Sequence, residues 1–289
     1  MANFVVCGAT GRTGSVVTRE LLNRGQRVTA IVRDPARAAP LKAAGVRLAM
    51  GSLEDPAVIN GALRGGDALF ALLPEDPFAP DFHAPRKAIT EALVRAVKES
   101  GVPHVVLLSA IAASLPSGNG PAGDLHQLEN ALAQTSTVLT TLRACWMQEN
   151  VGAAIKPASA AGIYPNLMFS ADAVVPTIAS RDVGTFIADV ITDQPRAETI
   201  DLLGPAYTVR QMSQVLGKAL NKPLRIIDIP PPAQVPTLMQ AGLSQSFAEA
   251  VAELYACFGT GRIKPKGDRQ LAGTTPLETT VRDMLTAAR

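Results

Sequence analysis

The chain has 289 residues, of which 47% are hydrophobic and 4% aromatic, and its formal net charge is +2 at pH 7. Its basic residues are dispersed and its aromatic residues are few, which argues against a nucleic-acid-binding surface. No run of about 18 apolar residues and no signal-peptide pattern occurs, so we expect a cytoplasmic protein with no membrane partner. The three cysteines, Cys7, Cys145 and Cys257, lie far apart without a Cys-x-x-Cys pair, so we expect neither disulfides nor a metal site.

The first half of the chain alternates strand and helix patterns. The predicted strands are Asn3–Cys7, Arg27–Val32, Val46–Met50, Ala68–Leu73, Val105–Ser109 and Val138–Leu142, and the predicted helices are Thr13–Arg24, Pro35–Ala44, Pro56–Leu63, Pro85–Glu99 and Leu125–Gln134. Short apolar strands that alternate with helices of about ten to fifteen residues indicate βαβ units and a parallel sheet. The pattern predicts an α/β fold of the Rossmann type, with a doubly wound parallel sheet whose nucleotide-binding domain spans residues 1–150.

The second half has a different pattern. A helix over Arg181–Thr192 and a strand over Glu198–Leu203 suggest that residues 180–204 return to the first sheet. Three capping boxes predict later helix starts, at Thr208/Gln211, Ser246/Glu249 and Thr275/Glu278, and between them come a strand over Leu224–Ile229 and the run Pro230-Pro231-Pro232, which is expected to leave regular structure. Most of residues 151–289 are therefore expected to form a smaller α+β lobe that covers the carboxyl edge of the sheet, where doubly wound sheets bind ligands.

A glycine-rich turn joins the first predicted strand to the first predicted helix. It reads Gly8-Ala9-Thr10-Gly11-Arg12-Thr13-Gly14, a GxxGxxG variant of the dinucleotide fingerprint. Glycine permits a sharp turn and lets a phosphate approach the backbone, and the first free N–H groups of the helix then face that phosphate. We expect Gly8, Thr10, Gly11, Arg12, Thr13 and Gly14 to bind the cofactor; the alternative is an ordinary glycine-rich turn.

The end of the second predicted strand bears on the choice of cofactor. NAD-specific sites usually place a carboxylate there for the ribose hydroxyls, whereas the 2′-phosphate of NADP requires a cation. Arg33 holds this position and Arg12 lies in the glycine loop, so the sequence favours NADP(H) over NAD(H). In the alternative interpretation, Arg33 and Asp34 are surface charges and Asp34 caps the following helix.

Other candidate contacts follow the fourth and sixth predicted strands. Leu72, Leu73 and Pro74 are expected beside the pyrophosphate and nicotinamide ribose, as backbone and packing contacts. Trp146, Met147 and Asn150 are expected to form an apolar substrate wall with one polar contact, and Phe78 and Phe82 an opposite wall or a lid. The alternative for the two phenylalanines is packing between the lobes.

Several of these segments together resemble the NmrA-like branch of the atypical short-chain dehydrogenases/reductases. They are Gly8 to Gly14, Val32-Arg33-Asp34-Pro35, Gly45-Val46 with Gly51 to Pro56, and Leu142-Arg143 with Trp146 to Asn150. The resemblance implies an NADP(H)-binding fold whose members are either reductases, including quinone reductases, or redox-sensing regulators without turnover.

The chain departs from this wider superfamily at the catalytic pair. Short-chain dehydrogenases normally use Tyr-x-x-x-Lys, but Tyr164, Tyr207 and Tyr255 are followed four residues later by Met168, Gln211 and Gly259. Ser109 matches the position of the superfamily's catalytic serine, and the alternative is a serine that satisfies backbone groups. His126 lies where a proton donor is needed, and the alternative is a polar residue paired with Glu129.

These features lead to two hypotheses. The first is an NADPH-dependent oxidoreductase that reduces a small apolar or aromatic acceptor, such as a quinone, enone, carbonyl or imine, with the proton supplied by water or His126. The alternative is a non-catalytic NADP(H)-sensing regulatory protein that binds partner proteins. The first needs a small-molecule partner only, and a homodimer is compatible with either.

Overall fold

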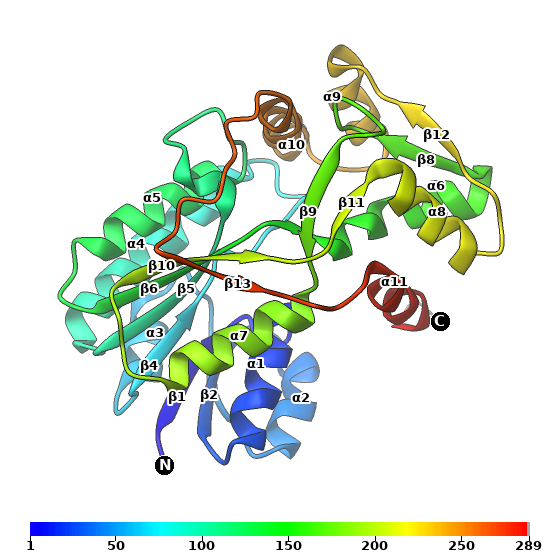
Figure 1. Ribbon diagram of the computed structural model, residues 1–289. Coiled ribbons are helices and arrows are strands. Elements are labelled where there is room, and N and C mark those ends of the chain that lie inside the picture. Colours follow the sequence, from blue (N-terminus) through cyan, green and yellow to red (C-terminus); the bar gives the residue numbers. More distant parts are fainter. Residues whose placement is uncertain (288–289) are drawn as a thin grey trace.

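The computed structural model describes residues 1–287 (Figure 1). Its centre is an eight-stranded sheet in the order β13-β10-β6-β5-β4-β1-β2-β3, in which every neighbouring pair is parallel. The strands are β1 (Asn3–Cys7), β2 (Arg27–Val32), β3 (Arg47–Met50), β4 (Ala68–Ala71), β5 (His104–Ala110), β6 (Val138–Ala144), β10 (Glu198–Leu203) and β13 (Arg269–Ala272). The order reverses direction between β1 and β4, which is the switch point at which such sheets bind ligands.

Helices cover both faces of this sheet. On one face lie α1 (Arg12–Asn23), α2 (Pro35–Ala43) and α7 (Ser180–Thr192), and on the other α3 (Pro56–Leu63), α4 (His83–Ser100) and α5 (Ala122–Ala133). β1 shows why both faces need a cover: Phe4 and Val6 pack into the first core, whereas Val5 and Cys7 pack into the second. A strand buried on both sides is continuously apolar, as the sequence of β1 is. The predicted Rossmann-type fold is confirmed.

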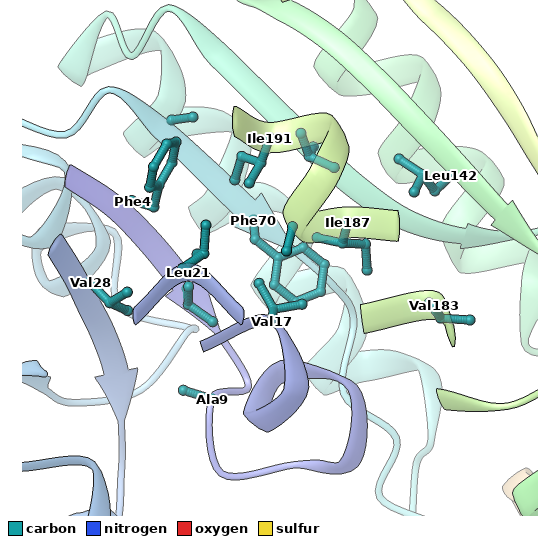
Figure 2. Packing of buried hydrophobic residues seen from close by; sticks show 14 of the residues in the cluster. Phe4, Ala9, Val17, Leu21, Val28, Phe70, Leu142, Val183, Ile187 and Ile191 are labelled. Carbon is teal, nitrogen blue, oxygen red and sulfur yellow. The ribbon is translucent and has the colours of Figure 1, made fainter. Parts of the chain in front are cut away.

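The first core fixes the position of α1 beside the sheet. Figure 2 shows Val17 and Leu21 of α1 directed toward Phe70 of β4 and Ile187 of α7. A Cβ atom on Gly184 of α7 would overlap the Val16 side chain, so the glycine permits the close approach of the two helices. The helix that follows the β1–α1 turn is therefore held in place by β4 and α7.

A smaller lobe stands beyond the carboxyl edge of the main sheet (Figure 1). It contains a three-stranded sheet of β11 (Ala206–Thr208), β9 (Val174–Ile178) and β7 (Trp146–Met147), and a parallel pair of β8 (Ile163–Asn166) with β12 (Arg225–Asp228). Its helices are α6 (Ile155–Ala161), α8 (Val209–Ala219), α9 (Pro231–Gln240), α10 (Gln245–Gly259) and α11 (Leu277–Ala287). Residues of α6, α8, α10 and α11 contribute to a third core that includes Met212, Leu216 and Val281.

The element boundaries of the lobe correct three expectations. The proline run does not leave regular structure, because Pro231 and Pro232 form the first turn of α9, where no backbone N–H is needed. The cap of α10 is Ser244 rather than Ser246, with its side chain accepting from the Phe247 N–H at 3.2 Å. The last helix, α11, begins at Leu277, and the Thr275 hydroxyl, expected in a capping box with Glu278, donates to Asp182 of α7 at 2.6 Å instead.

One further expectation about local structure holds. The Thr208/Gln211 capping box at the start of α8 is present as predicted. Gly25, Gly45 and Gly101 adopt φ values of 69°, 85° and 64°, a left-handed conformation that ends the preceding helix shortly before the next strand. Among residues 1–287, no helix combines the length and the apolar character that crossing a membrane requires.

Candidate functional site

The glycine loop forms a tight cradle between β1 and α1. Gly8 has φ of 63°, and the Gly11 N–H donates to the Gly8 carbonyl at 2.8 Å. A Cβ atom on Gly14 would overlap that same carbonyl, and one on Gly11 would lie 3.2 Å from it. The three glycines therefore let the first turn of α1 fold back onto the loop. Side chains at these positions would fill the space next to the loop backbone.

The amino end of α1 has the features of an anion site. The helix begins at Arg12 with Gly11 as its N-cap, and no side chain within residues 1–287 caps it. Its first N–H groups are thus available to a ligand, and the helix dipole favours a negative charge there. Arg12 is exposed and adds a positive charge at the same end. This environment fits a phosphate or pyrophosphate.

Charged groups at the end of β2 extend this positive region. Arg33 is exposed, and Asp34 uses its Oδ1 atom to accept from the Ala36 N–H at 2.8 Å, which caps α2. The Arg37 guanidinium donates to the Thr10 carbonyl of the glycine loop at 3.4 Å. Sequence reasoning missed Arg37, although its place in the first turn of a helix that starts beside the loop was a usable signal.

The segment after β4 is held by a buried arginine. The Arg86 side chain is 2% exposed, and its guanidinium donates to the carbonyls of Leu73 at 3.4 Å and Pro74 at 3.1 Å. It also forms an ion pair with Asp124 of α5 at 2.6 Å. Leu72 closes over the glycine loop, since a Cβ atom on Gly8 would lie 3.0 Å from its side chain. Arg86 therefore fixes the expected cofactor segment 72–74 from behind.

A cavity of about 960 Å³ separates the carboxyl edge of the sheet from the lobe. Arg12 of α1 and the strand ends Ala110 and Ala144 line one side of it. The lobe contributes an apolar wall that includes Trp146, Met147, Phe169, Val175, Leu238, Phe247, Val251, Leu254, Tyr255 and Phe258. Few charged or polar side chains interrupt it: Arg12, Glu75, Glu149 and Asn150. The predicted wall residues Trp146, Met147 and Asn150 all line this cavity.

The two phenylalanines expected opposite that wall are placed differently. Phe78 is 68% exposed and Phe82 is 1% exposed, and neither lines the cavity. The Phe82 ring packs against Phe247 of α10, with 4.9 Å between the ring centroids. The Arg86 guanidinium lies over the Phe82 ring, 4.9 Å from its centroid. Phe82 thus supports the cavity wall from behind, which is the packing alternative raised for it.

Glu149 is a carboxylate on the cavity wall that sequence reasoning did not select. Its Oε1 atom accepts from the Ser180 N–H at 2.9 Å and from the Ser180 hydroxyl at 2.5 Å. It therefore caps the amino end of α7, where the helix dipole stabilises a negative charge. No clear signal marked it, because the helix that it caps starts about thirty residues later in the chain.

Ser109 belongs to a buried network and does not line the cavity. Its hydroxyl donates to Glu129 Oε1 at 2.5 Å, and Glu129 accepts from Arg143 at 3.0 Å and 2.5 Å. Hydrogen bonding to Glu129 raises the pKa of Arg143 above its ordinary value. The serine hydroxyl is therefore engaged between β5, β6 and α5, and its partner is a carboxylate side chain rather than the backbone groups of the alternative interpretation.

His126 is likewise absent from the cavity lining. Its Nδ1 atom lies 2.8 Å from the Ala113 carbonyl and its Nε2 atom lies 2.9 Å from the Asn130 side-chain nitrogen. Both contacts are satisfied by a neutral ring that donates from Nδ1 and accepts at Nε2. The alternative interpretation of His126, a pairing with Glu129, is also wrong, because that carboxylate binds Ser109 and Arg143 instead.

The three tyrosines have distinct surroundings. Tyr164 is buried and its hydroxyl contacts the Met212 sulfur at 3.9 Å, while the Tyr207 hydroxyl accepts from the Leu277 N–H at 3.0 Å. Tyr255 of α10 lines the cavity beside Trp146. Burial raises the pKa of Tyr255. A search for Tyr-x-x-x-Lys missed Tyr255, because only tertiary structure brings it to the cavity.

Comparisons with known proteins agree with the architecture. The chain is 27% identical over 255 residues to the NAD(P)H azoreductase of Xenophilus azovorans, covering 88% of this chain and 86% of that protein. It is 25% identical over 254 residues to quinone oxidoreductase 2 of Escherichia coli, with 86% of each chain covered.

Solved structures show the same fold at lower identity. The triphenylmethane reductase of Citrobacter sp. in complex with NADP(H) matches with a TM-score of 0.81 at 22% identity, covering 97% of this chain and 99% of that one. The NADPH-dependent quinone oxidoreductase of Escherichia coli in complex with NADPH matches with a TM-score of 0.77 at 23% identity, covering 98% and 99%. The model of the NmrA-like family matches residues 2–281. The chain therefore belongs to the NmrA-like family.

Proposed function

We propose that the protein is an NADPH-dependent oxidoreductase that reduces a small apolar or aromatic acceptor, such as a quinone, enone, carbonyl or imine. The observation that carries this proposal is the apolar cavity, which extends from Arg12 of the glycine loop to the lobe wall around Trp146. A site of this kind holds a cofactor and an apolar molecule next to each other. The names of the azoreductase and quinone oxidoreductase relatives support a reductase.

The residues around the glycine loop fit a dinucleotide. Gly8, Gly11 and Gly14 form the cradle, with Thr10, Arg12 and Thr13 beside it, and Leu72, Leu73 and Pro74 form the facing segment. The pyrophosphate is assigned to the free N–H groups at the start of α1. When bound, NADPH supplies the hydride for the reduction.

The charges beside the loop favour NADP(H) over NAD(H). Arg33 is exposed at the end of β2, and Arg37 reaches the loop carbonyl of Thr10. Asp34, the carboxylate nearest to the expected ribose, is engaged as the cap of α2. Two cations and an engaged carboxylate suit a 2′-phosphate better than a pair of ribose hydroxyls. We assign Arg33 and Arg37 to that phosphate.

The acceptor is assigned to the lobe side of the cavity. Trp146 and Met147 offer a flat and an adaptable apolar surface, and Asn150 offers one polar contact. Ser109 and His126 have no place in this assignment, because their polar atoms are engaged elsewhere. A quinone suits such a site, since its reduced form needs little help with protons from the protein.

The test is NADPH consumption by the purified protein against a panel of quinones, enones, aldehydes and imines. Turnover of at least one neutral aromatic acceptor is expected, and addition of an excess of NADP⁺ should inhibit it. NADPH binding without consumption across the whole panel would contradict the reductase proposal and favour a sensing function.

A further inference from the structure

Tyr255 occupies a distinctive position in the cavity. It lies on the face of α10 that lines the cavity together with Phe247, Val251 and Phe258, at helical spacing. Its ring centroid is 6.2 Å from that of Phe258, within an otherwise apolar environment. Within residues 1–287, it is the one tyrosine that lines this cavity. A phenol group is therefore presented on the wall assigned to the acceptor.

Tyr255 and Trp146 both line this wall of the cavity. Because an indole N–H can only donate a hydrogen bond, Trp146 does not take up the hydroxyl hydrogen of Tyr255, which stays available to a ligand. Trp146 belongs to β7, just after β6, and Tyr255 belongs to α10. The two residues are far apart in the sequence and lie on the same lobe wall of the cavity.

The other tyrosines do not offer an equivalent group. The Tyr164 hydroxyl is directed to the Met212 sulfur in the third core, and the Tyr207 hydroxyl supports the start of α11 through Leu277. Burial keeps Tyr255 protonated by raising its pKa, so it remains a hydrogen-bond donor at neutral pH. A protonated donor in an apolar site stabilises charge as it develops on a substrate atom.

We propose that Tyr255 is a catalytic residue that donates a hydrogen bond to the oxygen or nitrogen atom of the acceptor. This inference rests on the proposed reductase function and gives the phenol a role that the absent Tyr-x-x-x-Lys pair leaves open. The donor binds the neutral acceptor weakly and the reduced, negatively charged form more strongly. Tyr255 therefore selects acceptors that carry a heteroatom conjugated to the reduced position.

The single tryptophan of the chain makes this proposal testable without turnover. Trp146 is the only tryptophan in the sequence and it lines the cavity, so its fluorescence reports on ligands there. We would titrate the NADP⁺-loaded protein with 1,4-naphthoquinone and with naphthalene, which has the same ring system without oxygen atoms. The variants are Tyr255→Phe and, as a matched control, Tyr164→Phe.

Loss of one neutral hydrogen bond should weaken naphthoquinone binding to Tyr255→Phe by about 2- to 10-fold. Naphthalene affinity should stay unchanged in that variant, and both affinities should stay unchanged in Tyr164→Phe. In the NADPH assay, kcat for the quinone or an enone should fall about 10- to 100-fold in Tyr255→Phe, because the donor acts mainly on the charged form.

The possible outcomes separate this inference from the proposed function. Equal loss of naphthoquinone and naphthalene affinity would overturn the inference, since it would show that the phenol only shapes the wall. Unchanged naphthoquinone affinity in Tyr255→Phe would overturn it as well. If the wild type consumes no NADPH but shows the selective loss of quinone binding, the reductase function fails and the hydrogen bond from Tyr255 stands.

Discussion

Replacement of Arg33 by alanine probes how the protein distinguishes the two nicotinamide cofactors. The change removes an exposed guanidinium at the end of β2 and leaves the Asp34 cap of α2 in place. A hydrogen bond to a charged group contributes about 1.5–3 kcal/mol, and solvent exposure places Arg33 at the lower end of this range. About 1.4 kcal/mol corresponds to a tenfold change in affinity, so Arg33→Ala should weaken NADPH binding about tenfold.

NADH lacks the 2′-phosphate, so its affinity should change by less than about twofold in the same variant. Calorimetric titration of both cofactors measures the two effects directly. Arg47→Ala is the matched control, because Arg47 is an exposed arginine at the amino end of β3, on the opposite edge of the sheet from the glycine loop. Equal weakening of NADPH and NADH in Arg33→Ala, or equal affinities of the wild type for both, would refute the assignment of the phosphate to Arg33.

Three further changes test separate parts of the structure. Gly11→Val should abolish NADPH binding, because the branched side chain enters the loop cradle, while circular dichroism should still show a folded domain. Retained NADPH affinity in a folded variant would mean that the glycines only shape a turn. His126→Ala should leave kcat within about threefold of wild type across pH, since both ring nitrogens are engaged by Ala113 and Asn130, and a 100-fold loss would restore its role as a proton donor. Burial lowers the pKa of His104 from 6.5 to about 4. The free energy of unfolding should therefore fall as the pH decreases between these values, by roughly 3 kcal/mol at most. If a His104→Gln variant showed the same pH dependence, the effect would belong to other groups.

The sign of the His104 effect follows from its surroundings. The ring is 2% exposed and its Nε2 atom lies 2.9 Å from the Thr140 hydroxyl, which itself donates to the Arg196 carbonyl at 2.6 Å. The folded state therefore holds the neutral imidazole, whereas the unfolded chain binds a proton below its ordinary pKa. Between these two pKa values only the unfolded state is protonated, so acid favours unfolding.

The sequence predicts the main sheet well because its strands have a strong local signal. β1 is buried on both faces and reads as a continuous apolar run, and the glycine loop that follows it is defined by contacts within a few residues. β13 was missed because Arg269–Ala272 is mostly exposed and carries no apolar pattern; it joins the sheet by backbone pairing with β10. Local pattern cannot identify a strand whose stability comes from its neighbour.

The candidate site was only partly predictable for a related reason. Trp146 and Met147 follow a recognisable strand, so their position at the carboxyl edge could be inferred. Tyr255 lies on a helix more than a hundred residues away, and only the packing of the lobe brings it to Trp146. Ser109 was placed at the correct strand end, but its engagement by Glu129 and Arg143 depends on side chains from two other elements.

The most direct test of the reductase assignment compares NADPH consumption in the wild type and in Gly11→Val with 1,4-naphthoquinone as the acceptor. The wild type should oxidise NADPH with a kcat of at least about 1 s⁻¹, in the range of ordinary enzymes, and Gly11→Val should not exceed the rate without protein. The same rate in both proteins would show that the reaction does not use the cavity beside the glycine loop. A wild type that binds NADPH but oxidises none of it would show that this site senses the cofactor without catalysing a reduction.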